Sequence, residues 1–428
     1  MDRPTTLVAV EMGYGHLRAA APLAAELGTE ILECDRPPLA APDEAARWRR
    51  TRSGYEALSR AAAAPLFGGP LRRLLEQITD IPGLYPIRDQ SAPTAGAKML
   101  ARMARGGLGR PMIEMVARED GVLLTTFYAP AVIAREAGLK RIVCVVTDSD
   151  VNRVWAPVDA AAGGIHYCAP GQGARRRLRA FGVPDEWIHV TGFPLPPSLT
   201  GGDDLDALRR NLAARIVRLD PRGAFRAEAR GELAHFLGPL PKDEEGRPPL
   251  LVFAVGGAGA QAALARQFLP ALRGAIFTGR LRLALVAGTR PEIADGFRRE
   301  LRAAKLEDAP PGSIEILLER DFASYYAAFN ALLARADVLW TKPGELSFYA
   351  ALGLPLVFAP ALGVHERANR RFVRIRGAGF KQEQPRCAWD WLRHWLEEGI
   401  LAGAAWAGYT RMPKFGARNV ADVVRSVE

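Results

Sequence analysis

The chain has 428 residues and a formal net charge of +10 at pH 7. That length exceeds the usual size of a single hydrophobic core, so we expect two domains. With 49% hydrophobic and 24% charged residues, and with Gly and Pro scattered between apolar runs, the composition excludes a disordered or fibrous chain. No stretch approaches the ~18 uninterrupted apolar residues that a membrane span requires.

Short apolar runs alternate with helical patterns in the first part of the chain. The runs are nearly continuously apolar, as strands buried on both faces of a parallel sheet are. Helical patterns lie between them, which gives the βα alternation of an α/β protein. The predicted strands are 6–12, 30–35, 121–127 and 140–148, and the predicted helices include 16–28 and 130–138.

The stretch from about 44 to 118 departs from this rhythm. Arg and Lys interleave there with Leu, Met, Phe and Ala, as in RWRRTRSGYEAL and KMLARMARGGLGR. Such segments lie in a lipid interface in some proteins, with the apolar face toward the lipid and Arg outward. In others they are solvated helices packed on their own domain. The sequence leaves both interpretations open.

A second α/β series begins with the apolar run in PLLVFAVGGAGAQ (249–261). Its further predicted strands are 281–289, 313–319, 336–342 and 354–360, with helices at 325–336 and 346–353. The intervening segment, 196–248, is rich in Pro, Gly and charge and predicts a linker with inserted helices. We therefore expect an α/β fold of two Rossmann-like domains that face each other across a cleft.

The cysteines and the start of the sequence indicate the cellular compartment of the protein. Cys34, Cys144, Cys168 and Cys387 lie far apart with no CxxC pair, which predicts neither a disulfide framework nor a zinc site. The opening MDRPTTLVAV runs directly into a strand pattern, without the features of a signal peptide. We expect a cytoplasmic protein that binds no metal, cofactor or nucleic acid. Its positive charge suits an anionic membrane surface or a phosphorylated substrate, or reflects surface arginines without a dedicated role.

The first glycine turn is Gly13-Tyr14-Gly15-His16, between the first strand and the first helix. Gly13 and Gly15 let the backbone turn tightly and approach a ligand at the helix N-terminus. Ligands of open α/β sheets bind at this edge. A neutral imidazole there is able to accept a proton from a hydroxyl, so His16 is a candidate general base and otherwise a capping or packing residue. Asp148, after VVT, is a second candidate polar group, and its alternative is a strand-end turn residue.

The second glycine loop follows the strand at 249–255. Backbone N–H groups and a helix N-terminus there suit a diphosphate. The loop lacks the Lys-Ser/Thr of a P-loop, so ATP hydrolysis is not indicated. The candidate ligand-binding residues of this loop are Gly256, Gly257, Gly259 and Gln261.

The third constellation is TKPGELSFYAALGLPLVFAPALGVHERAN (341–369). Two predicted strands end in it, and each delivers polar residues to the same edge of one sheet. Cations and N–H groups suit phosphates, and carboxylates suit ribose hydroxyls. The candidate residues are Lys342, Gly344, Glu345, His365, Glu366 and Asn369.

The order GYGH, VVTD, VTGFP, VGGAG and TKPGE…GLPLV…HERAN…GAG resembles the family of monogalactosyldiacylglycerol synthases and the lipid-linked N-acetylglucosaminyltransferase of peptidoglycan synthesis. The resemblance covers roughly 5–195 and 248–380. It implies the glycosyltransferase-B fold, a UDP-sugar donor and inversion of the anomeric centre. Its domains would be an acceptor-side domain at 1–195, the linker at 196–248, a nucleotide-sugar-binding domain at 249–385, and C-terminal helices at 386–428 that cross back.

The resemblance also implies roles for single residues. His16 would lie near the acceptor and the sugar, where it is a candidate base, and residues 256–261 would lie near the donor diphosphate. Glu366 and Asn369 would lie near the sugar. The acceptor would be a small molecule or a lipid, and the protein would bind peripherally to the inner face of the membrane if it meets one.

One position departs from the family pattern. The family carries a ribose-binding Glu in the helix before GLP, and Phe348 stands at that position here. Glu345 at the helix start is the alternative carboxylate. Two other functions therefore stay open beside an inverting hexosyltransferase: a nucleotide-sugar epimerase of the same architecture, and a non-catalytic nucleotide-sugar-binding protein.

Overall fold

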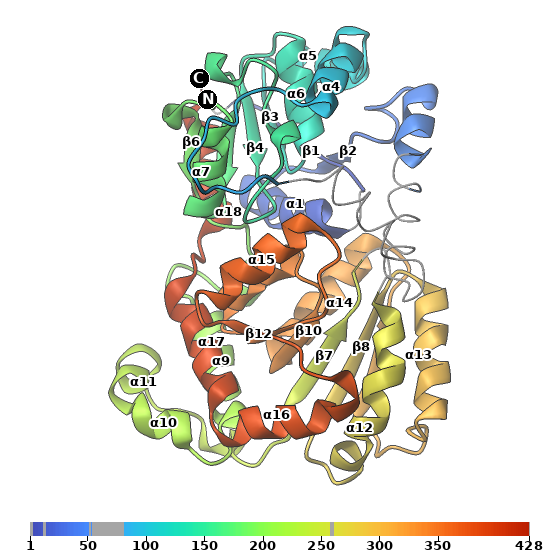
Figure 1. Ribbon diagram of the computed structural model, residues 1–428, viewed down its shortest axis with the longest axis vertical. Coiled ribbons are helices and arrows are strands. Elements are labelled where there is room, and N and C mark those ends of the chain that lie inside the picture. Colours follow the sequence, from blue (N-terminus) through green and yellow to red (C-terminus); the bar gives the residue numbers. More distant parts are fainter. Residues whose placement is uncertain (1–2, 12–13, 51–52, 54–80, 257–260, 428) are drawn as a thin grey trace. The chain divides into compact units, whose positions relative to one another are not determined.

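The computed structural model describes residues 3–11, 14–50, 53, 81–256 and 261–427 (Figure 1). Contacts within the chain divide it into two compact units. Unit 1 comprises Met1–Leu195, Leu362–Asn369 and Pro413–Glu428, and unit 2 comprises Pro196–Ala361 and Arg370–Met412. Each unit is built on its own six-stranded sheet.

The sheet of unit 1 is parallel throughout, with strand order β2-β1-β3-β4-β5-β6. Its apolar strands are buried on both faces, which explains why they read as continuous apolar runs. The strands are β1 (Thr5–Ala9), β2 (Ile31–Glu33), β3 (Val122–Thr125), β4 (Ile142–Val145), β5 (His166–Ala169) and β6 (Ile188–Val190).

Helices connect and cover these strands. They are α1 (Tyr14–Leu27), α4 (Ala95–Arg105), α5 (Arg110–Glu119), α6 (Tyr128–Glu136), α7 (Gln172–Ala180) and α18 (Gly416–Ser426). Helix α4 begins where the Thr94 hydroxyl accepts a hydrogen bond from the Ala97 amide. The last helix, α18, packs against α1, and the Asn419 side chain donates to the Thr191 carbonyl oxygen at 2.8 Å. The end of the chain therefore belongs to unit 1.

The sheet of unit 2 is also parallel, with strand order β12-β11-β10-β7-β8-β9. Its strands are β7 (Leu250–Ala254), β8 (Arg282–Gly288), β9 (Ile314–Leu318), β10 (Val338–Thr341), β11 (Leu356–Phe358) and β12 (Gly379–Lys381). Read from β9, the order is that of the dinucleotide-binding sheet, with the chain reversing direction between β7 and β10.

The helices of unit 2 pack on this sheet or on one another (Figure 1). They are α8 (Pro197–Thr200), α9 (Asp206–Leu219), α10 (Ala224–Glu228), α11 (Arg230–Leu237), α12 (Ala265–Phe277), α13 (Pro291–Ala303), α14 (Phe322–Arg335), α15 (Val364–Arg374), α16 (Ala388–Glu397) and α17 (Ile400–Arg411). Helix α15 starts in a segment that belongs to unit 1 and continues into unit 2. A 3₁₀ helix, η6 (Glu345–Leu352), joins β10 to β11.

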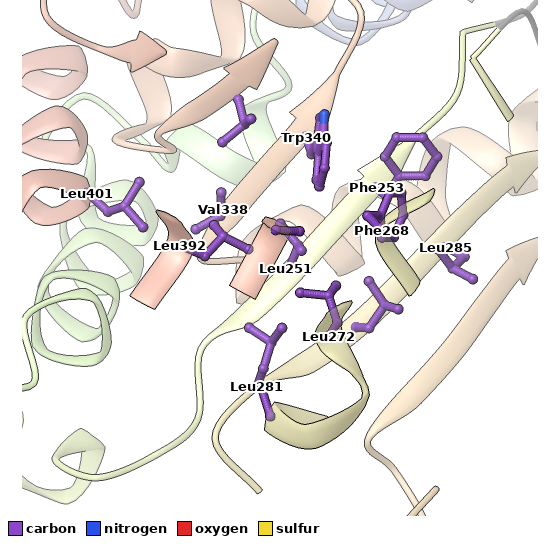
Figure 2. Close-up of a cluster of buried hydrophobic side chains, with 14 of the residues drawn as sticks. Leu251, Phe253, Phe268, Leu272, Leu281, Leu285, Val338, Trp340, Leu392 and Leu401 are labelled. Carbon is purple, nitrogen blue, oxygen red and sulfur yellow. The ribbon is translucent and has the colours of Figure 1, made fainter. Parts of the chain in front are cut away.

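The core of unit 2 is aromatic at its centre. Figure 2 shows Trp340 of β10 close to Phe253 of β7 and Phe268 of α12. The ring centroids of Phe268 and Trp340 are 4.8 Å apart, and those of Phe253 and Phe268 are 4.9 Å apart. All three side chains have no exposed surface, so their burial ties two strands to the covering helix.

A buried ion network fastens α9 to the sheet of unit 2. Asp337, which has no exposed surface, accepts hydrogen bonds from Arg218 at 2.9 Å and from the Leu250 amide at 2.7 Å. Arg218 also donates to Glu244 at 2.6 Å. Arg215 is fully buried and donates to backbone carbonyls, including that of Ala336 at 2.7 Å. Each buried charge is thus paired or hydrogen-bonded, as burial requires.

The α/β class with two parallel sheets is confirmed. All predicted strands are present, and each is shorter than predicted. The sequence analysis missed the short strands β5, β6 and β12, whose Tyr, His and Lys residues interrupt the apolar pattern. The predicted helix at 346–353 is present as the 3₁₀ helix η6.

In the described part of the 44–118 stretch, α4 packs on α6 through small alanines, including Ala97 and Ala101, and exposes Met99. Residues 51–52 and 54–80 of that stretch lie outside the described residues. None of the helices searched, all within the described residues, is long and apolar enough to cross a membrane.

Candidate functional site

In the sheet of unit 1 the strand order reverses at β1. The next strand in the chain, β2, lies on one side of β1, and β3 lies on the other side. Ligands of open α/β sheets bind at such a reversal, beyond the carboxyl ends of the strands. His16, in the first turn of α1, follows β1, and Thr126 directly follows β3. The predicted histidine therefore lies at the place where the topology favours a ligand.

Hydrogen bonds fix the His16 ring. Its Nδ1 lies 2.7 Å from the Thr126 carbonyl oxygen and 3.4 Å from the Thr147 hydroxyl oxygen. A carbonyl oxygen only accepts, so Nδ1 carries the hydrogen in the shorter contact. In the neutral ring Nε2 then holds the lone pair. The Thr126 hydroxyl donates back to the His16 carbonyl oxygen at 3.0 Å, which makes the pairing reciprocal.

The loop after β4 brings Asp148 to the same edge of this sheet. The Asn369 side chain donates from Nδ2 to the Asp148 carboxylate at 2.7 Å and accepts from the Ser149 amide at 2.8 Å. Asn369 has no exposed surface, so its amide is largely committed to this loop. The two predicted residues Asp148 and Asn369 thus lie together although 221 positions separate them in the chain.

Asp150 has a different role from its neighbour. Arg177 of α7 holds both oxygens of its carboxylate, at 2.7 and 2.9 Å, and also donates to the Gln90 side chain at 2.7 Å. Only 2% of the Arg177 side chain is exposed, so this bidentate pair is a buried anchor for the loop. The same loop carries Thr147 and Asp148, whose positions therefore depend on it.

In unit 2 the strand order reverses between the neighbouring strands β7 and β10, and three predicted residues lie close together at that point. Lys342 follows β10 and Gly256 follows β7. A Cβ on Gly256 would lie 2.7 Å from Lys342 Cδ, and one on Gly344 would lie 3.5 Å from Lys342 Cε and 3.9 Å from Nζ. The aliphatic part of the Lys342 side chain thus lies against the Gly256 backbone. It occupies the space that the Cβ of any other residue at 256 would need. A cation beside exposed backbone at a sheet reversal suits a phosphate group.

Gln261 connects the loop after β7 to the loop after β11. Its Nε2 donates to the Pro360 carbonyl oxygen at 3.3 Å, and its buried Oε1 has no partner within the described residues. Glu345 stands half-buried at the first position of η6. Gln261 therefore lies beside the end of β11, and Glu345 follows the end of β10 in the chain.

His365 and Glu366 lie in the first turn of α15. Glu366 is 4% exposed, and its carboxylate accepts from the Leu362 amide at 2.8 Å, as a capping carboxylate does. His365 is half-buried beside Gly363. This segment belongs to unit 1, together with Asn369.

Gly15 lies in the first turn of α1, whereas Gly13, Gly257 and Gly259 lie outside the described residues. Within the described ranges no three His, Cys, Asp or Glu side chains gather as a metal site would require. The four cysteines are free thiols, and burial raises the pKa of Cys144 and Cys168 well above the ordinary range.

Sequence reasoning missed Thr126, Thr147 and Arg177. The threonines stand at the ends of apolar strand patterns, where polar residues at a sheet edge are a usable signal. No sequence signal marks Arg177, because it is one of several arginines in GARRRLRA. Only tertiary packing selects it for burial.

Solved structures resemble this chain along its whole length. MurG from Acinetobacter baumannii matches with a TM-score of 0.51 at 15% identity, covering 98% of this chain and 99% of that one. A Listeria monocytogenes protein assigned as a UDP-N-acetylglucosamine 2-epimerase matches with a TM-score of 0.52 at 12% identity, covering 100% and 97%. The co-structure of S. aureus MnaA with UDP matches with a TM-score of 0.50 at 12% identity, covering 99% and 96%. The chain has the glycosyltransferase-B fold.

No protein-family model and no curated protein matches the chain in sequence. At these identities the structural likeness establishes the fold, and the reaction has to be argued from the residues.

Phe348, at the position where the sequence resemblance leads to the expectation of a Glu, packs in the interior of unit 2. It is 2% exposed, and its ring centroid lies 5.4 Å from that of Phe372 in α15 in an edge-to-face arrangement. A buried phenyl ring is unable to accept hydrogen bonds from ribose hydroxyls.

Proposed function

We propose that the protein is an inverting glycosyltransferase that moves a hexosyl group from a nucleotide-sugar, most suitably a UDP-sugar, to an acceptor hydroxyl. The observation that carries this proposal is the fixed His16 ring. Its Nδ1–H is held by the Thr126 carbonyl oxygen, so Nε2 is the basic nitrogen at a ligand-binding sheet edge.

In the proposed reaction, Nε2 of His16 takes the proton of the acceptor hydroxyl as its oxygen attacks the anomeric carbon. The bond from that carbon to the diphosphate oxygen breaks on the opposite face, which inverts the centre. Asp148 orients the acceptor from the neighbouring loop.

The leaving diphosphate gains negative charge in this step and needs compensation. We propose that Lys342 supplies it, together with backbone N–H groups of the loop that begins at Gly256. Gly257, Gly259, Gln261 and Gly344 would complete this donor side. No metal or organic cofactor enters the proposal.

We propose that Glu345, His365 and Glu366 bind the nucleoside and the sugar. Asn369 would hold the loop that carries Asp148. Glu345 is our candidate for the ribose because Phe348 is unsuited to it. Gly13 and Gly15 would let the backbone approach the acceptor beside His16.

Two alternatives keep specific support. A nucleotide-sugar epimerase is supported by the fold match to a protein assigned as a UDP-N-acetylglucosamine 2-epimerase. A non-catalytic nucleotide-sugar-binding protein is supported by the buried Phe348 at the expected ribose position.

The first experiment is a thermal-shift screen of UDP, GDP, dTDP and their sugars. We expect UDP and one UDP-sugar to raise the melting temperature, since a ligand that binds only the folded state stabilises it. If no nucleotide raises it, the nucleotide-sugar assignment fails for all three functions.

The second experiment follows the chosen UDP-sugar over time with wild-type protein and His16→Asn. UDP release that depends on His16 supports a transferase. An epimerised sugar nucleotide without UDP release supports the epimerase, and binding without turnover supports the binding protein.

We also propose a cytoplasmic location with peripheral binding to anionic membranes. Co-sedimentation with vesicles that contain or lack phosphatidylglycerol tests the membrane part, and the absence of lipid-dependent pelleting would contradict it.

A further inference from the structure

An open cavity of about 320 Å³ lies on unit 2, between α12 and the short 3₁₀ helix η7 (Pro385–Cys387). Helix α12 packs against η7 and against α16, which follows η7 in the chain (Figure 1). The residues that line the cavity are Arg266, Gln267, Pro270 and Arg386. None of them belongs to the candidate site at the strand ends, so the cavity is a separate feature of this unit.

The helical pattern of α12 turns three of these residues toward the cavity. Phe268 and Leu269 have no exposed surface and belong to the core of unit 2. Arg266, Gln267 and Pro270 lie on the opposite face of the helix and are exposed. The burial of one face of α12 therefore fixes which residues form the first wall of the cavity.

Hydrogen bonds fix the backbone of the second wall. The carbonyl oxygen of Gln384 accepts from the Cys387 amide at 2.9 Å and from the Trp391 indole N–H at 3.1 Å. Trp391 is 8% exposed and belongs to the core of unit 2. The backbone on both sides of Arg386 is thus anchored, whereas the Arg386 side chain is exposed.

Two arginines line this cavity without a negative partner. Neither Arg266 nor Arg386 forms an ion pair or a side-chain hydrogen bond with any residue that the structure describes. Helix α12 contains no Asp or Glu, and the nearest acidic residues on either side of Arg386 in the chain, Glu383 and Asp390, do not pair with it. A guanidinium offers a planar fork of N–H donors that matches a phosphate or a carboxylate. The two positive charges therefore favour an anionic ligand.

Pro270 and Gln267 add hydrogen-bonding groups that an anion alone does not match. A proline has no N–H, so the carbonyl oxygen of Arg266 lacks the intrahelical donor that residue 270 would otherwise supply. The Gln267 side chain both donates and accepts, and it has no hydrogen-bond partner among the described residues. Hydroxyl groups also donate and accept, so a ligand with hydroxyls suits this wall.

Charge and size narrow the class of ligand further. A phosphate monoester carries a charge of about −1.5 to −2 at pH 7, which two arginines neutralise, whereas a carboxylate carries one negative charge. The volume of about 320 Å³ lies at the lower end of the roughly 300–1,000 Å³ of small-molecule sites. The cavity therefore has room for an organic part beside the phosphate group. None of its lining residues is aromatic, so it offers no ring for a nucleobase to stack on.

We propose that this cavity binds a small hydroxylated phosphate monoester, such as a sugar phosphate. Arg266 and Arg386 pair with the phosphate oxygens, and Gln267 and the Arg266 carbonyl oxygen form hydrogen bonds with hydroxyl groups. Because both arginines are exposed, salt screens these ion pairs and weakens the binding. The inference does not depend on the proposed transferase function, because no residue of the candidate site takes part in it.

The test measures binding of glucose 6-phosphate to the full chain by isothermal titration calorimetry at low ionic strength, with UDP titrated in parallel. The variants are Arg266→Gln, Arg386→Gln and the double variant. Arg299→Gln is the matched control, because Arg299 is an exposed arginine of α13 in the same unit that does not line the cavity. Glucose, inorganic phosphate and glucuronate are the further probes, for the hydroxyls alone, the phosphate alone and a sugar with a carboxylate.

We expect Arg266→Gln and Arg386→Gln each to weaken glucose 6-phosphate binding about twofold to fivefold, as the loss of an exposed ion pair does. The double variant should weaken it further, and Arg299→Gln should leave it unchanged. Glucose 6-phosphate should bind more tightly than each of the three probes, and more weakly at about 0.15 M salt than at low ionic strength. UDP affinity should equal that of the wild type in every variant.

The inference is overturned if the wild type does not bind glucose 6-phosphate, or if the two cavity variants bind it as tightly as the wild type. Equal affinity for inorganic phosphate would refute recognition of the hydroxyls, and equal affinity for glucuronate would refute the preference for phosphate. A parallel loss of UDP affinity in Arg266→Gln and Arg386→Gln would assign the cavity to the nucleotide-sugar site instead. If UDP binds none of the proteins while glucose 6-phosphate binds as expected, only the proposed function fails.

Discussion

Replacing Gly256 by alanine should weaken nucleotide binding through Lys342. The new Cβ would lie 2.7 Å from Lys342 Cδ and 3.4 Å from Cγ. Carbon atoms in ordinary contact are about 3.5–4.0 Å apart, so the lysine stem has to move by about 1 Å. A hydrogen bond to a charged group contributes about 1.5–3 kcal/mol. If the shift removes the lysine–phosphate contact, the Kd for UDP should rise roughly tenfold to hundredfold.

Calorimetric titration of UDP into the wild type, Gly256→Ala, Lys342→Ala and the double variant measures this effect. The alanine at position 256 acts through the lysine side chain. It should therefore raise the Kd for UDP only slightly in a protein whose Lys342 is already alanine. Gly274→Ala is the control, because a Cβ there meets no atom within 4 Å and the residue lies inside α12. It should leave the UDP affinity unchanged and stabilise the fold by about 0.5–1 kcal/mol. An additive double variant, or an unchanged Kd in Gly256→Ala, would refute the reasoning.

Three further predictions concern catalysis, stability and pH. His16→Asn should lower kcat about 10²- to 10⁴-fold with UDP affinity unchanged, because the Asn amide replaces the Nδ1 donor but not the basic Nε2, as steady-state kinetics would measure. Asp337→Asn should destabilise unit 2 by about 3 kcal/mol in urea unfolding, because Arg218 loses a buried charge partner. Burial and the neighbouring His189, whose Nε2 lies 3.1 Å from its Nδ1, lower the pKa of His166 to about 4. The folded state therefore resists protonation, and stability should fall as the pH drops from about 6.5 to about 4, by roughly 1 kcal/mol after solvent screening.

Matched variants separate these effects from general damage. Asp308→Asn changes an exposed carboxylate of unit 2 and should leave the urea midpoint unchanged. For the pH effect, His166→Gln should lose stability less steeply than the wild type between pH 6.5 and 4. An equal slope in the two proteins would show that the histidine pair does not carry the acid sensitivity.

Much of the candidate site was predictable because strand ends are visible in the sequence. The apolar runs that became β1, β7 and β10 end in GYGH, VGGAG and TKPGE, and parallel strands deliver their carboxyl ends to one edge. His16, Gly256 and Lys342 were therefore identifiable as edge residues without any contact information.

Which side chains meet at that edge was decided by strand order. His16 is paired with Thr126 and Thr147 because β3 and β4 follow β1 in the sheet, an order that no local pattern encodes. Asn369 reached Asp148 and the Ser149 amide from 221 and 220 positions away, so its commitment to a loop was not readable from the motif HERAN.

The sequence by itself determined the two successive α/β halves, because hydrophobic periodicity records which strands are buried on both faces. It also determined the glycine turns, since their backbone geometry depends on the residue type. Only the tertiary structure decided the hydrogen-bond partners of His16 and the burial of Arg177 and Phe348. Those properties depend on partners distant in the chain, and a side chain's partner is set by sheet order and packing, which local patterns do not specify.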